Sequence, residues 1–351
     1  MLDFSSNQTG LPRNTRCVAW VGLTAMLGVI LASPSHAHVR WFVANDALQQ
    51  HVIEPFRLFE PAVLIWIAIA AVLVAIAIVL DLKLPTPPIA PTKIRHDVME
   101  LMRILTGMSL LLTAYDGGLI APHLQATGYL GGSLLFLQAG IGILLLSNHF
   151  LHHAALLMLL MYVGLLTQFG VVRTIEYINF VGIALFTLFN YFPNEDLRTR
   201  LKPYSVDVLR IFTGLSLMIL GYFEKLHPAA LGQVFIADFS WNFMPLVGFD
   251  WFDDRLFVLS AGVMEIVFGL ILVLGVVTRL NILAVAGLML CSNLVFILQQ
   301  NKDAALMEFI GHLPIIATAL ILLLLGYGQR LKVTTVFSSR AQRAVTGLTN
   351  A

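Results

Sequence analysis

Apolar residues along this chain are gathered into stretches of about twenty, which is the length that an α-helix needs to cross a bilayer. These stretches recur from the first third of the chain almost to its end. They lie near residues 59–81, 97–115, 131–148, 151–170, 174–191, 206–223, 255–276, 280–299 and 306–328. The pattern predicts nine membrane-crossing helices, and therefore an all-α polytopic membrane protein.

An internal repeat runs through these helices. Residues 98–115 read VMELMRILTGMSLLLTAY, and residues 205–222 read SVDVLRIFTGLSLMILGY. Further along the chain, the segment at Gln138 aligns with the segment at Glu265. Repeats of this kind are typical of membrane proteins built from two packed halves.

The two copies are predicted to be parallel four-helix repeats that follow one extra transmembrane helix. The first copy comprises residues 97–192 and the second residues 205–328, and they share an aligned pair of acidic residues, Glu176 and Glu308. Each copy is expected to enter from the cytoplasm and to return to it, which gives both the same orientation. The second copy also contains an aromatic and acidic insertion within residues 235–254.

The sequence outside the two copies divides into five parts. They are a signal peptide (1–37), a short extracytoplasmic segment (38–58), the extra helix (59–82), a Pro-rich cytoplasmic linker (83–96) and a cytoplasmic tail (329–351). Arg13 and Arg16 precede an apolar run that ends in the small-residue sequence SPSHA, so we expect cleavage after Ala37. The alternative is an uncleaved anchor helix with the same orientation.

Composition and charge agree with this topology. The 351 residues are 58% hydrophobic and 12% charged, with a mean hydropathy of +0.85. Lysine and arginine are concentrated in the segments assigned to the cytoplasm, as the positive-inside rule requires. We therefore expect a multi-pass protein of the bacterial inner membrane, with a periplasmic mature N-terminus and a cytoplasmic C-terminus. A formal net charge of +1 argues against nucleic-acid binding.

The second copy resembles the DoxX/DoxD family of small four-helix bacterial membrane proteins. The resemblance rests on Arg210 in LRIFTGLSLMILGYFEKLHP, Glu265 in GVMEIVFGLILVLGVVTR and Glu308 in EFIGH, and it covers residues 205–328 well. It implies a small inner-membrane subunit, linked in some members to thiosulfate:quinone oxidoreduction or to oxidative-stress defence. The chain departs from the family pattern by duplication and by Gln138 at the position of Glu265.

Charged residues within the apolar stretches are the candidate functional residues. Glu265 lies near the middle of its predicted helix, where a carboxylate is costly, so it must face the bundle. It would serve as a proton-binding or ligand-binding carboxylate, or else as one partner of an inter-helix hydrogen bond. Glu308 and His312 lie four residues apart on one helix face, where they could hold a proton or a metal, or simply cap the helix start.

Glu224 and Lys225 lie where the sixth predicted helix leaves the membrane, and they could close a polar pocket that faces outward. Gly117 and Gly118 occupy the matching positions of the first copy, so we expect the second copy to be the active half. Arg210 completes the candidate catalytic set, although snorkelling of its side chain near the cytoplasmic helix end would also account for it.

The predicted mature N-terminus offers a different kind of site. His38 would carry an α-amine and an imidazole on one residue, which together can chelate copper, and His51 is a candidate further ligand.

These features predict a membrane subunit that supports an extracytoplasmic redox process, linked to quinone, or a metal-handling process. Its expected partners are the lipid bilayer and a periplasmic or membrane protein. One alternative is a proton-linked transporter of a small solute or ion, acting through Glu265, Glu308 and His312. The second alternative is a structural assembly factor that catalyses no reaction and transports nothing. A redox subunit should copurify with a quinone-reactive partner, whereas a transporter should move solute alone in liposomes.

Overall fold

The computed structural model of the protein describes residues 39–43, 54–85, 92–227, 230–326 and 329–335. All regular elements within these residues are helical, and eight helical segments are long and apolar enough to cross a membrane. The expected all-α polytopic membrane protein is thereby confirmed. Seven of the eight segments lie in the helices α2 (Pro61–Lys83), α3 (Thr92–Tyr115), α4 (Gly128–Ser147), α5 (Leu151–Phe169), α11 (Asp254–Leu274), α12 (Thr278–Leu298) and α13 (Lys302–Leu325). The eighth segment, Glu195–Leu226, is centred on α9 (Ser205–Leu220).

Shorter elements connect these helices. They are the 3-10 turn η1 (Val39–Trp41), α6 (Val171–Ile175), α7 (Asn179–Tyr191), α8 (Glu195–Leu201), the 3-10 turn η3 (Lys202–Tyr204), the π-helical turn η4 (Gly221–Leu226), α10 (Ala230–Phe239) and the 3-10 turn η5 (Pro245–Val247). Several helices begin where the sequence supplies a cap: the side chains of Asn194, Asp253 and Asn301 each accept a hydrogen bond from a backbone amide three residues later.

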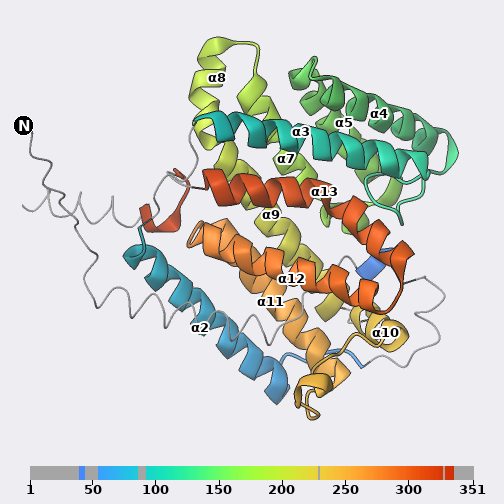
Figure 1. Ribbon diagram of the computed structural model, residues 1–351, viewed down its shortest axis with the longest axis vertical. Helices are drawn as coiled ribbons and strands as arrows, with labels where there is room; N and C mark the ends of the chain where they lie inside the picture. The colour runs from blue at the N-terminus through green and yellow to red at the C-terminus, as the bar shows by residue number, and fades with distance from the viewer. Residues whose placement is uncertain (1–38, 44–53, 86–91, 228–229, 327–328, 336–351) are drawn as a thin grey trace, which may run out of the picture.

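The helices pack in the same order in both halves of the chain. Helix α3 packs along α4 and α5 packs along α7, just as α9 packs along α11 and α12 along α13. The two halves meet along two seams, because α7 lies against α9 and α13 lies against α3 (Figure 1). Each half therefore places its last helix against the first helix of the other half.

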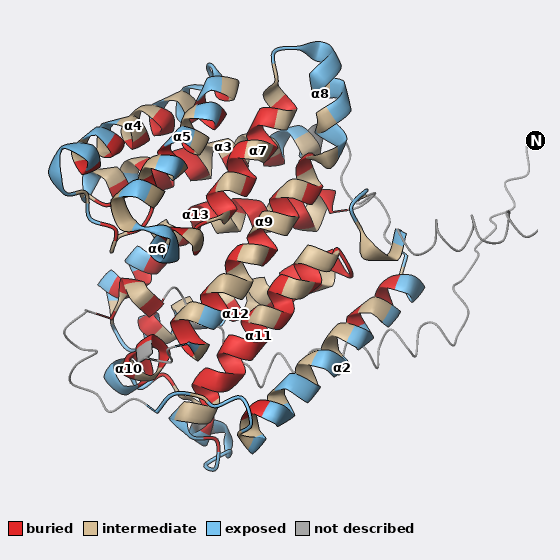
Figure 2. Ribbon diagram, turned by 180° about the vertical axis from the view of Figure 1, so that it is seen from behind, coloured by how far each residue is buried: buried red, intermediate tan, exposed pale blue. Residues whose placement is uncertain are grey.

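One difference between the halves concerns their second and third helices. Helix α5 packs closely along α4, whereas α12 packs only loosely against α11. The side chains of α11 are nonetheless mostly buried, since α9, η4 and α2 also cover this helix (Figure 2). The separation of α12 from α11 leaves space inside the second half.

Helix α2 lies at the edge of the bundle, against α11 (Figure 1). Much of its surface is apolar and exposed, as expected of a helix that faces lipid. Its one buried acidic residue, Asp81, accepts hydrogen bonds from the backbone amide of Val277 (2.9 Å) and the hydroxyl of Thr334 (2.9 Å). Asp81 also forms an ion pair with Lys332 (2.7 Å), so this carboxylate connects the end of α2 to the start of α12 and to the segment after α13.

Glycines allow the first two helices of each half to approach closely. A Cβ atom at Gly269 would lie 2.5 Å from the carbonyl oxygen of Gly214, and one at Gly142 would lie 3.0 Å from the carbonyl oxygen of Gly107. The same contact therefore occurs at both pairs of positions that the sequence alignment matched. Small residues at a helix crossing are the usual means by which membrane helices gain packing contacts.

One expectation about an individual helix changes in the structure. The helix expected over 174–191 begins only at Asn179, and its thirteen residues leave it outside the eight segments that are long enough to cross a membrane. Residues 176–178 instead form a turn that directs Glu176 into the protein. The first residues of the insertion 235–254 form the end of α10, and its aromatic residues Phe235 and Trp241 are buried against Phe296.

The predicted signal peptide, His38 and His51 lie outside the described residues, as do residues 86–91 of the linker and 336–351 of the tail.

We expect Gly269→Ala to lower the free energy of unfolding by about 1–3 kcal/mol, because the added methyl group overlaps the backbone of α9. The measurement is a titration with sodium dodecyl sulfate in mixed micelles. Gly287→Ala on α12 is the matched control, since nothing lies within 4 Å of its added Cβ. Equal stability of the two variants would contradict a close crossing of α9 and α11.

Candidate functional site

The π-helical turn η4 places two charged side chains inside the protein. Glu224 and Lys225 are adjacent in sequence, and each is only 1% exposed. π-helical turns are rare and occur frequently at functional sites. This turn packs closely on α11, because Gly221 approaches the carbonyl oxygen of Gly262. The turn thereby brings both charges next to the middle of α11.

Lys225 forms a buried ion pair with Glu265 on α11. Its ammonium donates hydrogen bonds to both carboxylate oxygens, at 2.7 and 2.8 Å. A charge removed from water is costly unless it is paired and hydrogen-bonded. A carboxylate in an apolar helix must find a partner inside the bundle, and Lys225 is that partner for Glu265.

A short segment that precedes α2 contributes the partners of Glu224. The backbone amides of Val39 and Arg40 donate hydrogen bonds to the two oxygens of Glu224, at 2.9 and 3.4 Å. The guanidinium of Arg40 pairs with Glu176 at 2.9 Å. We call residues 39–43 the N-terminal strap, since they connect Glu176 of the first half to Glu224 of the second.

Trp41 fixes the strap against the bundle. Its indole N–H donates a hydrogen bond to the hydroxyl of Tyr177 at 2.9 Å, and its ring lies 5.2 Å from the ring of His312. The ring also covers Gly311, where a Cβ atom would overlap the indole. The strap therefore contacts the turn before α7 and the middle of α13 at the same time.

His123, in the loop that connects α3 to α4, contacts Tyr177: its ring nitrogen Nδ1 is 3.5 Å from the tyrosine hydroxyl. Burial, reinforced by the charges of Arg40 and Arg173, lowers the pKa of His123 to about 3. The imidazole is consequently neutral at neutral pH, and it adds no charge to the cluster of Arg40, Glu176, Glu224, Lys225 and Glu265.

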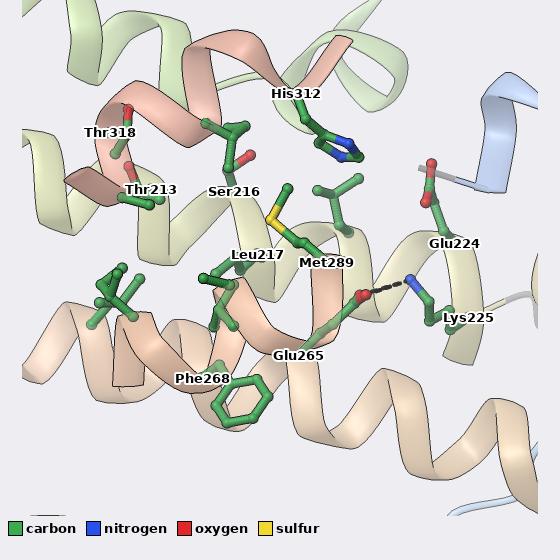
Figure 3. A pocket seen from close by; sticks show the side chains of 17 residues that line it. Thr213, Ser216, Leu217, Glu224, Lys225, Glu265, Phe268, Met289, His312 and Thr318 are labelled. Carbon is green, nitrogen blue, oxygen red and sulfur yellow. Dashed lines mark hydrogen bonds and ion pairs between the residues drawn. The ribbon is translucent and has the colours of Figure 1, made fainter. Parts of the chain in front are cut away.

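A cavity of about 80 Å³ extends from this charge cluster into the apolar interior of the second half. It lies where α12 is separated from α11, and helices α9, α11, α12 and α13 form its walls. Glu224, Lys225, Glu265 and His312 gather toward one end, whereas Phe268 and Leu217 belong to its apolar walls (Figure 3). The cavity is thus an apolar slot with a charged end.

The structure brings together four of the six predicted catalytic residues. Glu224, Lys225, Glu265 and His312 all line the cavity. Glu308 is buried one helical turn before His312, and it is not among the residues that line the cavity.

Arg210 lies elsewhere. It is fourteen residues before Glu224, which corresponds to roughly 21 Å along a helix axis. Its guanidinium donates to the carbonyl oxygens of Leu272 and of Val273 (2.9 Å), and it pairs with Asp207 at 3.4 Å. In the first half, Arg103 donates in the same way to the carbonyls of Leu145 and Leu146. These contacts tie the first helix of each half to the end of the second.

Gln138, which the alignment matched to Glu265, has a different set of contacts. It is fully buried, and its carbonyl oxygen accepts a hydrogen bond from the amide of Ile120 at 2.8 Å. Its amide nitrogen donates to the hydroxyl of Thr113 (2.9 Å) and to the carbonyl oxygens of Leu110 (3.0 Å) and Gly118 (3.1 Å). The first half therefore has a neutral, fully hydrogen-bonded amide where the second half has an ion pair.

Four residues in or beside the charge cluster were not identified from the sequence: Arg40, Trp41, Glu176 and Tyr177. The alignment of Glu176 with Glu308 was the one available signal, because it marked an acidic residue at a repeated position. Nothing local indicated that residues 39–43 would reach a carboxylate 185 positions away.

The described residues contain no group of three or more His, Cys, Asp or Glu side chains that could hold a metal ion. The predicted copper ligands His38 and His51 lie outside the described residues, so that site stays a prediction.

Residues 205–297 match the sequence model of the DoxX family. The matched segment extends from the start of α9 almost to the end of α12, and it includes Glu224, Lys225 and Glu265. The match agrees with a DoxX-like membrane protein and with the resemblance found in the sequence. A search of curated proteins and a search of solved structures each found no match to the chain.

We expect Glu265→Gln to destabilise the protein by about 3–5 kcal/mol, because it leaves the Lys225 ammonium buried without its carboxylate partner. The free energy of unfolding in mixed micelles measures this change. The double variant Lys225→Met, Glu265→Met replaces the pair with apolar side chains, and it should lie within about 1 kcal/mol of the parent protein. A single variant as stable as the double variant would show that the pair contributes no coupling energy.

We expect Trp41→Ala to cost about 3–5 kcal/mol, because it removes the buried indole that holds the strap against His312 and Tyr177. The same unfolding titration applies. Trp251→Ala is the matched control, since Trp251 is 69% exposed and should change the stability by less than about 0.5 kcal/mol. Unchanged stability in Trp41→Ala would mean that the strap is not a structural part of the bundle.

Proposed function

We propose that this chain is the membrane subunit of an extracytoplasmic redox system, and that its cavity binds the ring of a lipid-soluble quinone. The match of residues 205–297 to the DoxX family supports the assignment to this class of membrane proteins. The quinone itself is inferred from the cavity. A protein partner in the membrane or periplasm would supply the electrons.

The observation that carries the proposal is the form of the cavity. Its walls are mostly apolar, as the ring of a quinone requires, although the hydroxyl side chains of Thr213, Ser216 and Thr318 also line it. Its charged end holds Glu224, Lys225, Glu265 and His312. A volume of about 80 Å³ is several times the roughly 10–15 Å³ needed to admit one water molecule. The slot therefore suits a ring-sized group whose polar edge points toward the charges.

The residues at the charged end have the chemistry that quinone reduction needs, because two protons must accompany two electrons. The Lys225 ammonium is a hydrogen-bond donor for a carbonyl oxygen, and the His312 imidazole can donate or accept a proton. Glu265 is a carboxylate in hydrogen-bond contact with Lys225, so it can exchange a proton with that group. All three side chains are buried, so bulk water has little access to these contacts.

The charge balance of the cluster also supports proton-linked chemistry. Two cations, Arg40 and Lys225, face three carboxylates, namely Glu176, Glu224 and Glu265. A low-dielectric interior disfavours an uncompensated charge. The five groups together are therefore suited to hold one exchangeable proton.

The same cluster favours a second candidate function, proton-linked transport of a small solute or ion. The cluster lies where α7 of the first half meets α9 of the second, and transporters with internal repeats usually bind substrate at the interface of their halves. A transporter would move its solute in liposomes without a partner, whereas a redox subunit would copurify with a quinone-reactive protein. A structural assembly factor would do neither.

We further propose that the protein resides in the bacterial inner membrane with a periplasmic mature N-terminus, and that its two halves arose by duplication. The recurring glycine contacts and the recurring arginine contacts to helix ends support the duplication.

Met289→Trp tests the cavity, because its larger side chain would fill the slot from α12. We expect the quinone extracted per molecule of purified protein to fall by about tenfold or more, as measured by chromatography of the organic extract. The neighbouring variant Leu290→Trp is the matched control, since Leu290 is 72% exposed and does not line the cavity. Equal quinone content in the two variants would overturn quinone binding at this cavity.

A further inference from the structure

A second cavity, of about 250 Å³, lies at the opposite end of the second half from the charge cluster. The first turn of α3, the turn η3, the start of α9 and the end of α13 surround it. Three cationic side chains line it, and they come from three separate segments: Arg95, Lys202 and Arg330. Pro203, Val206 and Leu325 supply an apolar wall.

The one carboxylate that lines this cavity, Asp207, already has hydrogen-bond and ion-pair partners within the protein. Asp207 accepts hydrogen bonds from the backbone amides of Arg330 (3.0 Å) and Leu331 (3.3 Å), and it pairs with Arg210 at 3.4 Å. Its negative charge is thus matched by a buried guanidinium outside the group of three lining cations. Asp207 holds the chain after α13 in place, and it does not neutralise the cavity.

The three lining cations have no acidic partner in the part of the chain that the structure describes. Arg330 instead lies over the ring of Tyr204, at 5.4 Å from its centroid. The neighbouring stretches of sequence that the structure leaves undescribed, 86–91 and 327–328, contain neither Asp nor Glu. The cavity consequently carries an excess of positive charge that calls for an anion.

The depth of the cavity identifies the kind of anion. The membrane-crossing part of α3 begins at Ile94, and α13 ends at Leu325. Arg95 and Arg330 therefore lie at the level where the hydrocarbon region meets the lipid headgroups. Basic pockets between helices at this level bind the phosphates of anionic lipids. Arginine adds geometric selectivity, because its fork of N–H groups matches two phosphate oxygens.

We propose that this cavity binds the phosphate-bearing headgroup of an anionic phospholipid. Lys202 and the two arginines contact the phosphate oxygens, while Val206 and Leu325 face the glycerol and the first carbons of the acyl chains. The inference is independent of what the cavity near Glu265 binds. It predicts that the protein retains anionic lipid through purification in mild detergent.

The test uses the purified full-length chain in a zwitterionic detergent, titrated with short-chain phosphatidylglycerol, short-chain phosphatidylcholine or inorganic phosphate. Binding is followed by the rise in the thermal unfolding midpoint. We expect phosphatidylglycerol to bind at least about tenfold more tightly than phosphatidylcholine. Equal affinity for the two lipids would overturn the proposal. Inorganic phosphate that binds as tightly as phosphatidylglycerol would overturn the lipid as the ligand.

Matched variants assign the binding to this cavity. Lys202→Gln with Arg330→Gln should weaken phosphatidylglycerol binding by about tenfold or more. Lys83→Gln with Arg200→Gln removes the same charge from exposed residues that do not line the cavity, and it should change binding by less than about twofold. Lys202→Arg, which keeps the charge, should retain binding even if the Gln variants unfold. Equal losses in both double variants, or loss in Lys202→Arg, would overturn the proposal.

Discussion

The low dielectric of the membrane interior is the constraint on which this structure depends, because every charge that the helices carry inward must meet a partner there. Lys225 and Glu265 satisfy it directly, with two short hydrogen bonds between an ammonium and a carboxylate. Glu224 satisfies it through the backbone of the N-terminal strap, and Glu176 does so through Arg40. The strap, the π-helical turn and the seam between α7 and α9 are thus one arrangement that keeps charges paired inside the protein.

The two halves use the same packing for different purposes. In both halves, glycines bring the first two helices together and an arginine ties their ends. In the first half, the amide of Gln138 satisfies four backbone and side-chain groups, and α5 closes tightly on α4. In the second half an ion pair takes that place, and α12 leaves room for a cavity. In the first half the polar group is thus fully hydrogen-bonded within the packed helices, whereas in the second half it lies beside a cavity.

Charged side chains gather near the two ends of the second half, and each group lines a different cavity. At one end, carboxylates and cations are matched almost one for one, which suits proton exchange beside the apolar slot. At the other end, Arg95, Lys202 and Arg330 remain without carboxylates, which suits the binding of an anion. Arg210 lines neither of the two cavities. Its contacts with Asp207 and with the end of α11 fix the position of Asp207, which lines the cavity that contains Arg95, Lys202 and Arg330.

The sequence by itself determined the all-helical membrane fold and the positions of most helices, and it singled out Glu224, Lys225, Glu265 and His312 as candidate site residues, because apolar runs and charges within them are local features. The length of α7 and the strap were decided by tertiary structure. Arg40 and Trp41 act through contacts with residues more than 130 positions away, which no local pattern encodes. Helix packing likewise separates Arg210 from the site. It also leaves the gap between α11 and α12 that forms the cavity, and a local sequence pattern does not encode how helices pack against one another.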